Sequence, residues 1–210
     1  MISLSEILHT IAQALMIPCL IILIILMAGA VWQIGDIVVE YIAERRKHKC
    51  NVPQLLRDVH AAGADGLAEL IENSGLLRRQ KKALLELAES RGLPKDTLTA
   101  LAERLLATEE ARNACTTSIT DMIAKLGPMF GLLGTLIPLG PGIVALGQGD
   151  TVTLSESMNV AFDTTIAGVI SAAVASVISP IRKRWYNDDM VSLETLMEAV
   201  LEEVTSDVEG

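Results

Sequence analysis

The stretch KLGPMFGLLGTLIPLGPGIVALGQG, residues 125–149, carries no charged side chain after Lys125. The hydrocarbon core of a bilayer is about 30 Å thick and takes roughly 20 apolar residues in a helix, so this stretch is long enough to cross a membrane. It nevertheless holds six glycines up to Gly147 and three prolines, with a single threonine, Thr135, in the middle. The glycines and Thr135 fit a packing stripe, and the prolines are expected to bend the outer half of the helix.

Two further apolar blocks are as long. Residues 7–35 carry no charge apart from the titratable His9, and residues 157–181 contain one charged residue, Asp163. The first block has no basic leading region and is too long for the apolar part of a signal peptide, so we expect it to remain as a span. The chain is 50% hydrophobic, with its charges between the blocks. We predict an all-α membrane protein with three transmembrane helices.

Basic residues predict the orientation of these spans. The run ERRKHK, residues 44–49, follows the first block, and RKRW, residues 182–185, follows the third, whereas the link between the last two blocks has no Lys or Arg. Positive charge near membrane ends stays in the cytoplasm. We therefore expect an outside N-terminus, a cytoplasmic region at 43–125, an outside link at 148–156 and a cytoplasmic C-terminus.

Four segments follow from this pattern. They are an N-terminal segment with the first span (1–42), a cytoplasmic helical region (43–125), the second and third spans (126–181) and a cytoplasmic C-terminal helix (182–210). No helix breaker occurs between Asp96 and Leu126, which predicts one long helix entering the second span. The C-terminal helix is amphipathic, with apolar residues on one face and acidic residues on the other. It packs either on the cytoplasmic helices or on a partner subunit.

Enzyme and nucleic-acid signatures are missing from the sequence. It has no GxSxG, HExxH, Walker A or dinucleotide fingerprint, and its three histidines and three cysteines are dispersed. Aromatic residues make up 3% of the chain, and no basic patch is interleaved with them. The sequence therefore predicts no enzyme, no metal or other cofactor, and no nucleic-acid partner.

Small residues recur along the second and third blocks. In lipid, helices associate by close packing, and small side chains let the backbones approach. Gly127 and Gly131 form a GxxxG pattern that Gly134 and Thr135 extend. A similar stripe in the third block consists of Ala161, Thr165, Gly168, Ala172, Ala175, Ser176 and Ser179. We expect tight association of these helices, within one protomer or between copies. The threonine hydroxyls either bond to their own helix backbone or face a narrow polar pore.

Two motifs in these blocks resemble a known family. GPMFGLLGTLIPL, residues 127–139, is similar to the second-helix motif P-x-x-G-L-x-G-T-x-x-G of the MotA/TolQ/ExbB proton-channel family. In the third block, Ala161, Thr165 and Gly168 match that family's stretch of an Ala, three residues, a Thr, two residues and a Gly. The order of helices and the long segment before the second span also fit.

The resemblance implies a specific assembly. Such proteins form a ring in the inner membrane, usually a pentamer, around the single transmembrane helices of a smaller partner of the ExbD/TolR/MotB kind. The partner supplies a membrane aspartate, and Thr135 and Thr165 would supply the ring's hydroxyls beside it. Ion flow down the gradient would then move ring and partner against each other and do work outside the cytoplasm.

One position departs from the family pattern. Relatives such as ExbB carry a glutamate about five residues before the third-helix threonine, where this chain has Val160. Asp163 instead lies two residues before Thr165, on a different helical face. An acid within a membrane is a functional candidate by default. Asp163 is an ion-path carboxylate, a structural partner of a neighbouring chain, or a hydrated residue near the outer interface.

A second class of function stays open. The chain could be a non-conducting membrane scaffold whose cytoplasmic helices bind soluble proteins. Copurification discriminates between the two, because a scaffold would bring down soluble proteins but no small single-span subunit with a membrane acid. The sequence indicates neither the work that is driven nor whether the ion is a proton or sodium.

Overall fold

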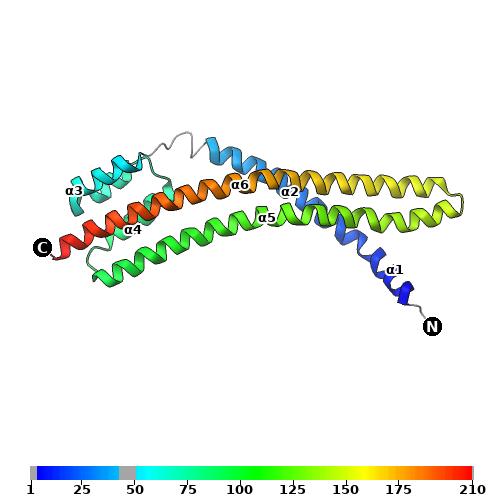
Figure 1. Ribbon diagram of the computed structural model, residues 1–210, viewed down its shortest axis with the longest axis horizontal. Coiled ribbons are helices and arrows are strands. Elements are labelled where there is room, and N and C mark those ends of the chain that lie inside the picture. Colours follow the sequence, from blue (N-terminus) through cyan, green and yellow to red (C-terminus); the bar gives the residue numbers. More distant parts are fainter. Residues whose placement is uncertain (1–3, 43–50, 210) are drawn as a thin grey trace. The chain divides into compact units, whose positions relative to one another are not determined.

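The computed structural model describes residues 4–42 and 51–209 (Figure 1). Within these residues the chain forms helices and no strand, which confirms the all-α prediction. The helices are α1 (Leu4–Ala14), α2 (Met16–Glu40), α3 (Val52–Asn73), α4 (Arg78–Glu89), α5 (Lys95–Gly147) and α6 (Thr151–Glu209). The basic run at 44–49, on which part of the orientation rests, lies outside the described residues.

Three stretches are long and apolar enough to cross a membrane, as the sequence predicts. They are Glu6–Glu40, Lys95–Gly147 and Thr151–Ser206. The first is interrupted at Leu15, between α1 and α2. Pro18 explains the interruption, because it has no N–H to donate to the carbonyl of Ala14, the last residue of α1. Regular bonding resumes where the N–H of Cys19 donates to the carbonyl of Leu15 at 3.0 Å.

Helix α5 is continuous from Lys95 to Gly147, so the chain does form one long helix that enters the second span. It stays helical through Pro128, Pro138 and Pro141. Each proline removes one backbone hydrogen bond, a loss that membrane helices tolerate when neighbouring groups satisfy the freed carbonyl. The outer half of the second span thus stays helical to its end at Gly147, despite its prolines.

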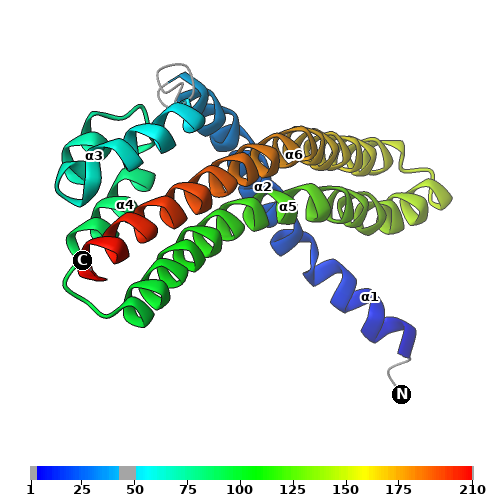
Figure 2. The ribbon, with the colours of Figure 1, turned by 60° about the vertical axis from the view of Figure 1, so that its left-hand side comes forward.

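A tight turn joins α5 to α6. Gly149 adopts a φ of 77°, a left-handed conformation that glycine accepts without strain. Asp150 then caps α6, because its Oδ1 accepts the N–H groups of Val152 and Thr153 and its Oδ2 accepts the Thr153 hydroxyl at 2.6 Å. The Thr153 hydroxyl is the main reason that the pKa of Asp150 is lowered. The turn sends α6 back along α5, and both views show the two helices side by side (Figure 2).

The chain divides into two compact units, which are described separately. The membrane unit consists of Met1–Ile37 and Thr117–Ile181. The head unit consists of Val38–Thr116 and Arg182–Gly210. Because α5 and α6 are continuous helices, each contributes one part to each unit.

The head unit has its own apolar core, built from α3, α4, the start of α5 and the end of α6. Its buried residues are Leu55, Val59, Leu67, Ile71, Leu76, Ala83, Leu84, Leu87, Ala88, Leu98, Ala102, Leu193, Leu196, Met197, Ala199, Val200 and Val204. The apolar stripe of the C-terminal helix thus packs on helices of its own chain. Of the two packing sites expected for this helix, the structure has the one within the chain.

In the head unit, an ion pair and an aromatic contact join residues 40–41 to residues 182–185 of α6. Arg182 is only 2% exposed, and its Nε lies 3.4 Å from Oε2 of Glu40. A buried charge is tolerated when an opposite charge accompanies it, so this ion pair explains how the arginine is accommodated. Tyr41 follows Glu40 in the chain and Trp185 lies three residues after Arg182, and the rings of Tyr41 and Trp185 stack with centroids 6.2 Å apart.

Removing a core side chain of the head unit should destabilise it. Leu196 is 1% exposed, and we expect Leu196→Ala to lower the free energy of unfolding by about 2–5 kcal/mol, because it leaves a cavity in close-packed surroundings. Val191 on the same helix is 56% exposed, so Val191→Ala should change stability by no more than about 0.5 kcal/mol. Unfolding of the full chain in detergent measures both, and equal effects of the two variants would contradict the assigned core.

Candidate functional site

In the membrane unit, α5 and α6 approach each other very closely at two glycines. A Cβ atom added at Gly168 would lie 2.5 Å from the carbonyl oxygen of Gly127, and one added at Gly127 would lie 2.7 Å from the carbonyl oxygen of Gly168. Both distances are far below van der Waals contact. The backbones of the two helices therefore touch here in a way that only glycine allows.

Further contacts continue this seam toward the outer end of the hairpin. A Cβ at Gly131 would lie 3.4 Å from the Cα of Gly168, and one at Gly134 would lie 2.6 Å from the Cβ of Thr164. At Gly142 the nearest atom is the Cβ of Ser157, at 3.1 Å. Each step outward on α5 corresponds to an equal step back along α6. We call this row of contacts the α5–α6 seam, and it defines the antiparallel register of the two helices.

The register brings Thr135 and Thr165 to one level. Gly134 and Thr164 are in contact, and each candidate threonine follows one of them in the chain. One residue turns a helix by about 100°, and in two antiparallel helices that turn leads to the same side of the contact. Consistent with this, a Cβ at Gly131 would lie 3.7 Å from the Cα of Thr165. The two threonines thus lie beside the seam at the same depth.

Both hydroxyls are bonded to backbone of their own helix. Thr135 Oγ1 donates to the carbonyl of Leu132 at 2.7 Å, and Thr165 Oγ1 donates to the carbonyl of Ala161 at 2.9 Å. Both side chains are half-buried. A hydroxyl that donates to a carbonyl keeps its oxygen lone pairs, so each can still accept a hydrogen bond from a protonated carboxyl group.

Thr164 is a seam residue that the sequence reasoning did not single out. It is 5% exposed, and its hydroxyl donates to the carbonyls of Val160 and Ala161 at 2.9 Å each. Thr164 and Thr165 are adjacent, and the spacing of small residues in the third block accommodates either one. The contact of Thr164 with Gly134 is the signal that distinguishes them, and it requires the register.

Helix α2 covers one side of the α5–α6 pair. Cys19 Sγ donates to the carbonyl of Phe130 at 3.4 Å. Further along α2, Ala30 is buried in a cluster with Ile123 and Ala175. Phe130 precedes the seam residue Gly131 by one position, so it lies on the side opposite Thr135. In the described part of the chain, α2 therefore packs on the side of the seam away from the two threonines.

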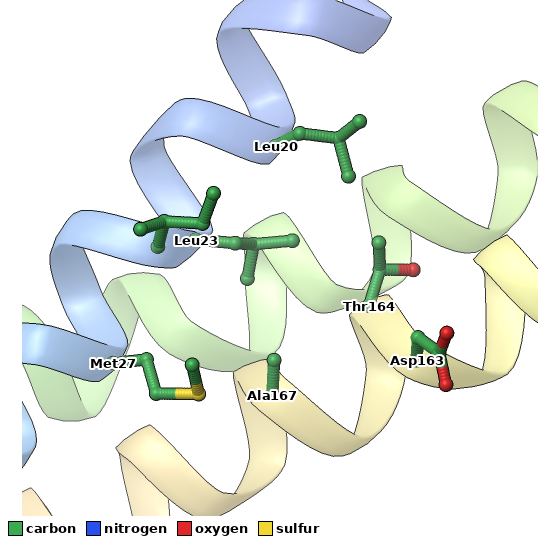
Figure 3. A pocket seen from close by; sticks show the side chains of 7 residues that line it. Leu20, Leu23, Met27, Asp163, Thr164 and Ala167 are labelled. Atoms are coloured by element: carbon green, nitrogen blue, oxygen red, sulfur yellow. The ribbon is translucent and has the colours of Figure 1, made fainter.

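Asp163 lies with α2 rather than with Thr135. It is exposed and forms one end of an open pocket between α2 and α6, with Met27 toward the other end (Figure 3). The other lining residues are Leu20, Leu23, Ile24, Thr164 and Ala167. Two residues before Thr165, Asp163 is turned by about 200° on the helix, which puts it across the seam from the threonine pair. Of the three candidate ion-path residues, the structure brings two together and separates the third.

No group of three or more His, Cys, Asp or Glu side chains suited to a metal ion occurs in the part of the chain that the structure describes. The fold and the seam define a three-span helical membrane protein whose last two spans form a tight antiparallel pair with paired threonines. The model of the MotA/TolQ/ExbB proton channel family matches residues 70–195. The chain belongs to this family. None of the curated proteins compared with the chain matches it.

Filling the seam should weaken the helix pair. Gly168→Ala adds a Cβ that would lie 2.5 Å from a backbone oxygen, so we expect a loss of about 1–3 kcal/mol in stability. Gly35 on α2 has nothing within 4 Å of its added Cβ, and Gly35→Ala should be neutral or stabilising by up to about 1 kcal/mol. Unfolding in mixed micelles compares the two, and an unaffected Gly168→Ala variant would show that the backbones do not touch.

Proposed function

We propose that this chain is the ring-forming subunit of an ion channel that uses the proton-motive force and passes work to a single-span partner. The observation that carries the proposal is the pair Thr135 and Thr165, which the seam register brings to one depth on the side of the helix pair away from α2. Membership of a proton channel family supports an ion-channel type of function.

The threonine pair suits the neighbourhood of a carboxyl group that gains and loses a proton. A hydroxyl donates to a carboxylate and accepts from a carboxylic acid, so Thr135 and Thr165 serve both states. The partner's membrane aspartate is the group we expect opposite them. One charge that crosses 100 mV releases about 2.3 kcal/mol, so a few ions per cycle are enough to move a two-state assembly.

Several copies are needed to enclose such a path. One α5–α6 pair forms a single wall, and its flanks expose large apolar side chains, such as Leu136 at 61% and Ile166 at 56%. In the membrane these flanks contact lipid or neighbouring copies. We propose a homo-oligomeric ring, a pentamer as the family resemblance implies, with the threonine side inward and α2 outward.

Asp163 has a different proposed role. It lies across the seam from the threonines, beside the α2 pocket, so we assign it to a contact with a neighbouring subunit or partner rather than to the ion path. A carboxyl group in apolar surroundings requires a proton or a polar partner, and a subunit contact supplies one.

We further propose that the chain lies in the inner membrane with its N-terminus outside and its C-terminus in the cytoplasm. The basic run at 182–185 supports this orientation. The stacked Tyr41 and Trp185 support a membrane boundary near them, because aromatic rings concentrate at such interfaces.

Replacing the threonines should stop ion flow. We expect Thr135→Val and Thr165→Val to reduce partner-dependent proton flux in proteoliposomes by about 10²-fold. Each substitution replaces a hydroxyl beside the ion path by a methyl group of similar size. Thr135→Ser and Thr165→Ser keep the hydroxyl and should retain most of the flux. If the valine variants assemble normally and conduct like the native chain, the site assignment is wrong.

The same preparation distinguishes the channel from a scaffold. A channel subunit should copurify with a small single-span protein that has a membrane acid, and the complex should conduct. Recovery of soluble proteins alone, with no flux from the native complex, would favour the scaffold.

The orientation can be read from cysteine labelling of intact cells with a membrane-impermeant maleimide. Cys115 is exposed and, on the proposed orientation, cytoplasmic, so it should react only after permeabilisation. Thr151→Cys in the exposed outer link should react without permeabilisation. A Cys115→Ser variant identifies the site of labelling, and reaction of Cys115 from outside would reverse the orientation.

A further inference from the structure

A carboxylate lies at the other end of the α5–α6 seam. Ser179 Oγ donates a hydrogen bond to Oδ1 of Asp121, which joins α6 to α5 within the membrane unit. Ser179 is 5% exposed and Asp121 is half-buried. A carboxyl group that is partly buried and held by one defined donor is restricted in position, as an ion-binding group must be.

The position of this pair relative to the two threonines follows from the register. Asp121 lies fourteen residues before Thr135, and Ser179 lies fourteen residues after Thr165. Fourteen residues advance a helix by about 21 Å and leave it turned by only about 40°. The Asp121–Ser179 pair therefore lies on nearly the same side of the seam as the threonine pair, about 21 Å from it along each helix.

The surroundings of this pair are polar and buried. Thr120, next to Asp121, is fully buried at 0% exposed. Asp121 is turned by about 200° from Ile123, which packs with Ala30 of α2, so the carboxylate lies on the side of the helix pair away from α2.

We propose that Asp121, held by Ser179, is the carboxylate at the cytoplasmic mouth of the ion path. The inference rests on the proposed channel function and names a residue of that path on this chain. A proton that leaves the threonine level moves through water in the proposed path to the Asp121 carboxylate, about 21 Å away, and its release to the cytoplasm regenerates the carboxylate. The Ser179 hydroxyl stabilises the ionised form and so adjusts the pH at which release occurs.

Other charged groups are attached to the elements that meet here. They are Asp36 on α2, Lys125 on α5 and, one turn beyond Ser179 on α6, Arg182 and Lys183. Arg182 pairs with Glu40, and Lys125 is exposed.

The test uses the native complex, isolated through a tag on this chain and reconstituted into liposomes that hold a pH indicator. A potassium diffusion potential drives the flux, and the pH on the cytoplasmic side is varied. We expect Asp121→Asn to lower flux at least about tenfold, and Asp121→Glu to restore much of it. Ser179→Ala should keep the flux but move the midpoint of its pH dependence to higher pH, because the carboxylate loses a donor. Glu156→Gln, on the exposed outer link, is the matched acid control and should behave as native.

Each outcome decides the proposal. Native flux in an assembled Asp121→Asn complex, together with loss of flux in Thr135→Val, would overturn the role of Asp121 and leave the channel function standing. If Asp121→Asn fails to assemble, Ser179→Ala decides alone, and an unmoved midpoint overturns the proposal. A native complex without flux overturns the channel function and this inference together. Replacing sodium by choline distinguishes the ion, because a proton path keeps its flux and its Asp121 dependence.

Discussion

The backbones of α5 and α6 touch at Gly127, Gly131 and Gly168, and most of what the membrane unit can do depends on this contact. In lipid no hydrophobic effect holds two apolar helices together, so packing at close range must do so. A Cβ atom at Gly168 would lie only 2.5 Å from the carbonyl oxygen of Gly127, so this contact requires a residue that has no Cβ. Once these glycines meet, the antiparallel register is set, and every other pairing between the helices follows.

Two polar pairs result from this one register. Thr135 and Thr165 share a level in the middle of the hairpin, and Asp121 and Ser179 share a level at its other end. The prolines of the second span do not interrupt α5, so the two levels remain connected by a continuous helix. The proposed path for ions along one side of the seam would therefore be a consequence of packing, with the polar groups at positions that the glycines have already aligned.

Much of the fold could be predicted from the sequence, because its signals are local. Uncharged blocks of sufficient length predict the three spans, and the lack of a breaker after Asp96 predicts the long helix. The same reasoning could not choose between the adjacent residues Thr164 and Thr165, since a stripe of small residues spaced three or four apart accepts both. The turn of about 100° between them decides which one enters the seam, and that depends on the partner helix.

For the same reason, contacts between residues far apart in the chain cannot be predicted from the sequence. Ser179 and Asp121 are 58 residues apart, and the ion pair of Arg182 with Glu40 spans more than twice that distance. In the sequence, Arg182 is only one of several basic residues that indicate orientation, whereas the structure buries it. Asp163 was a candidate for the ion path by its residue type alone, and its neighbours on α2 argue for a different role.

In the proposed channel, the threonine side of the seam faces an aqueous passage. Reactivity of single cysteines toward a small, charged, water-soluble thiol reagent in the assembled complex tests it most directly. Cysteines at 135 and 165 should react, whereas cysteines in place of Leu136 and Ile166, on the exposed apolar flanks of α5 and α6, should not. Unreactive cysteines at 135 and 165, with the flanks reactive or equally inert, would contradict the claim.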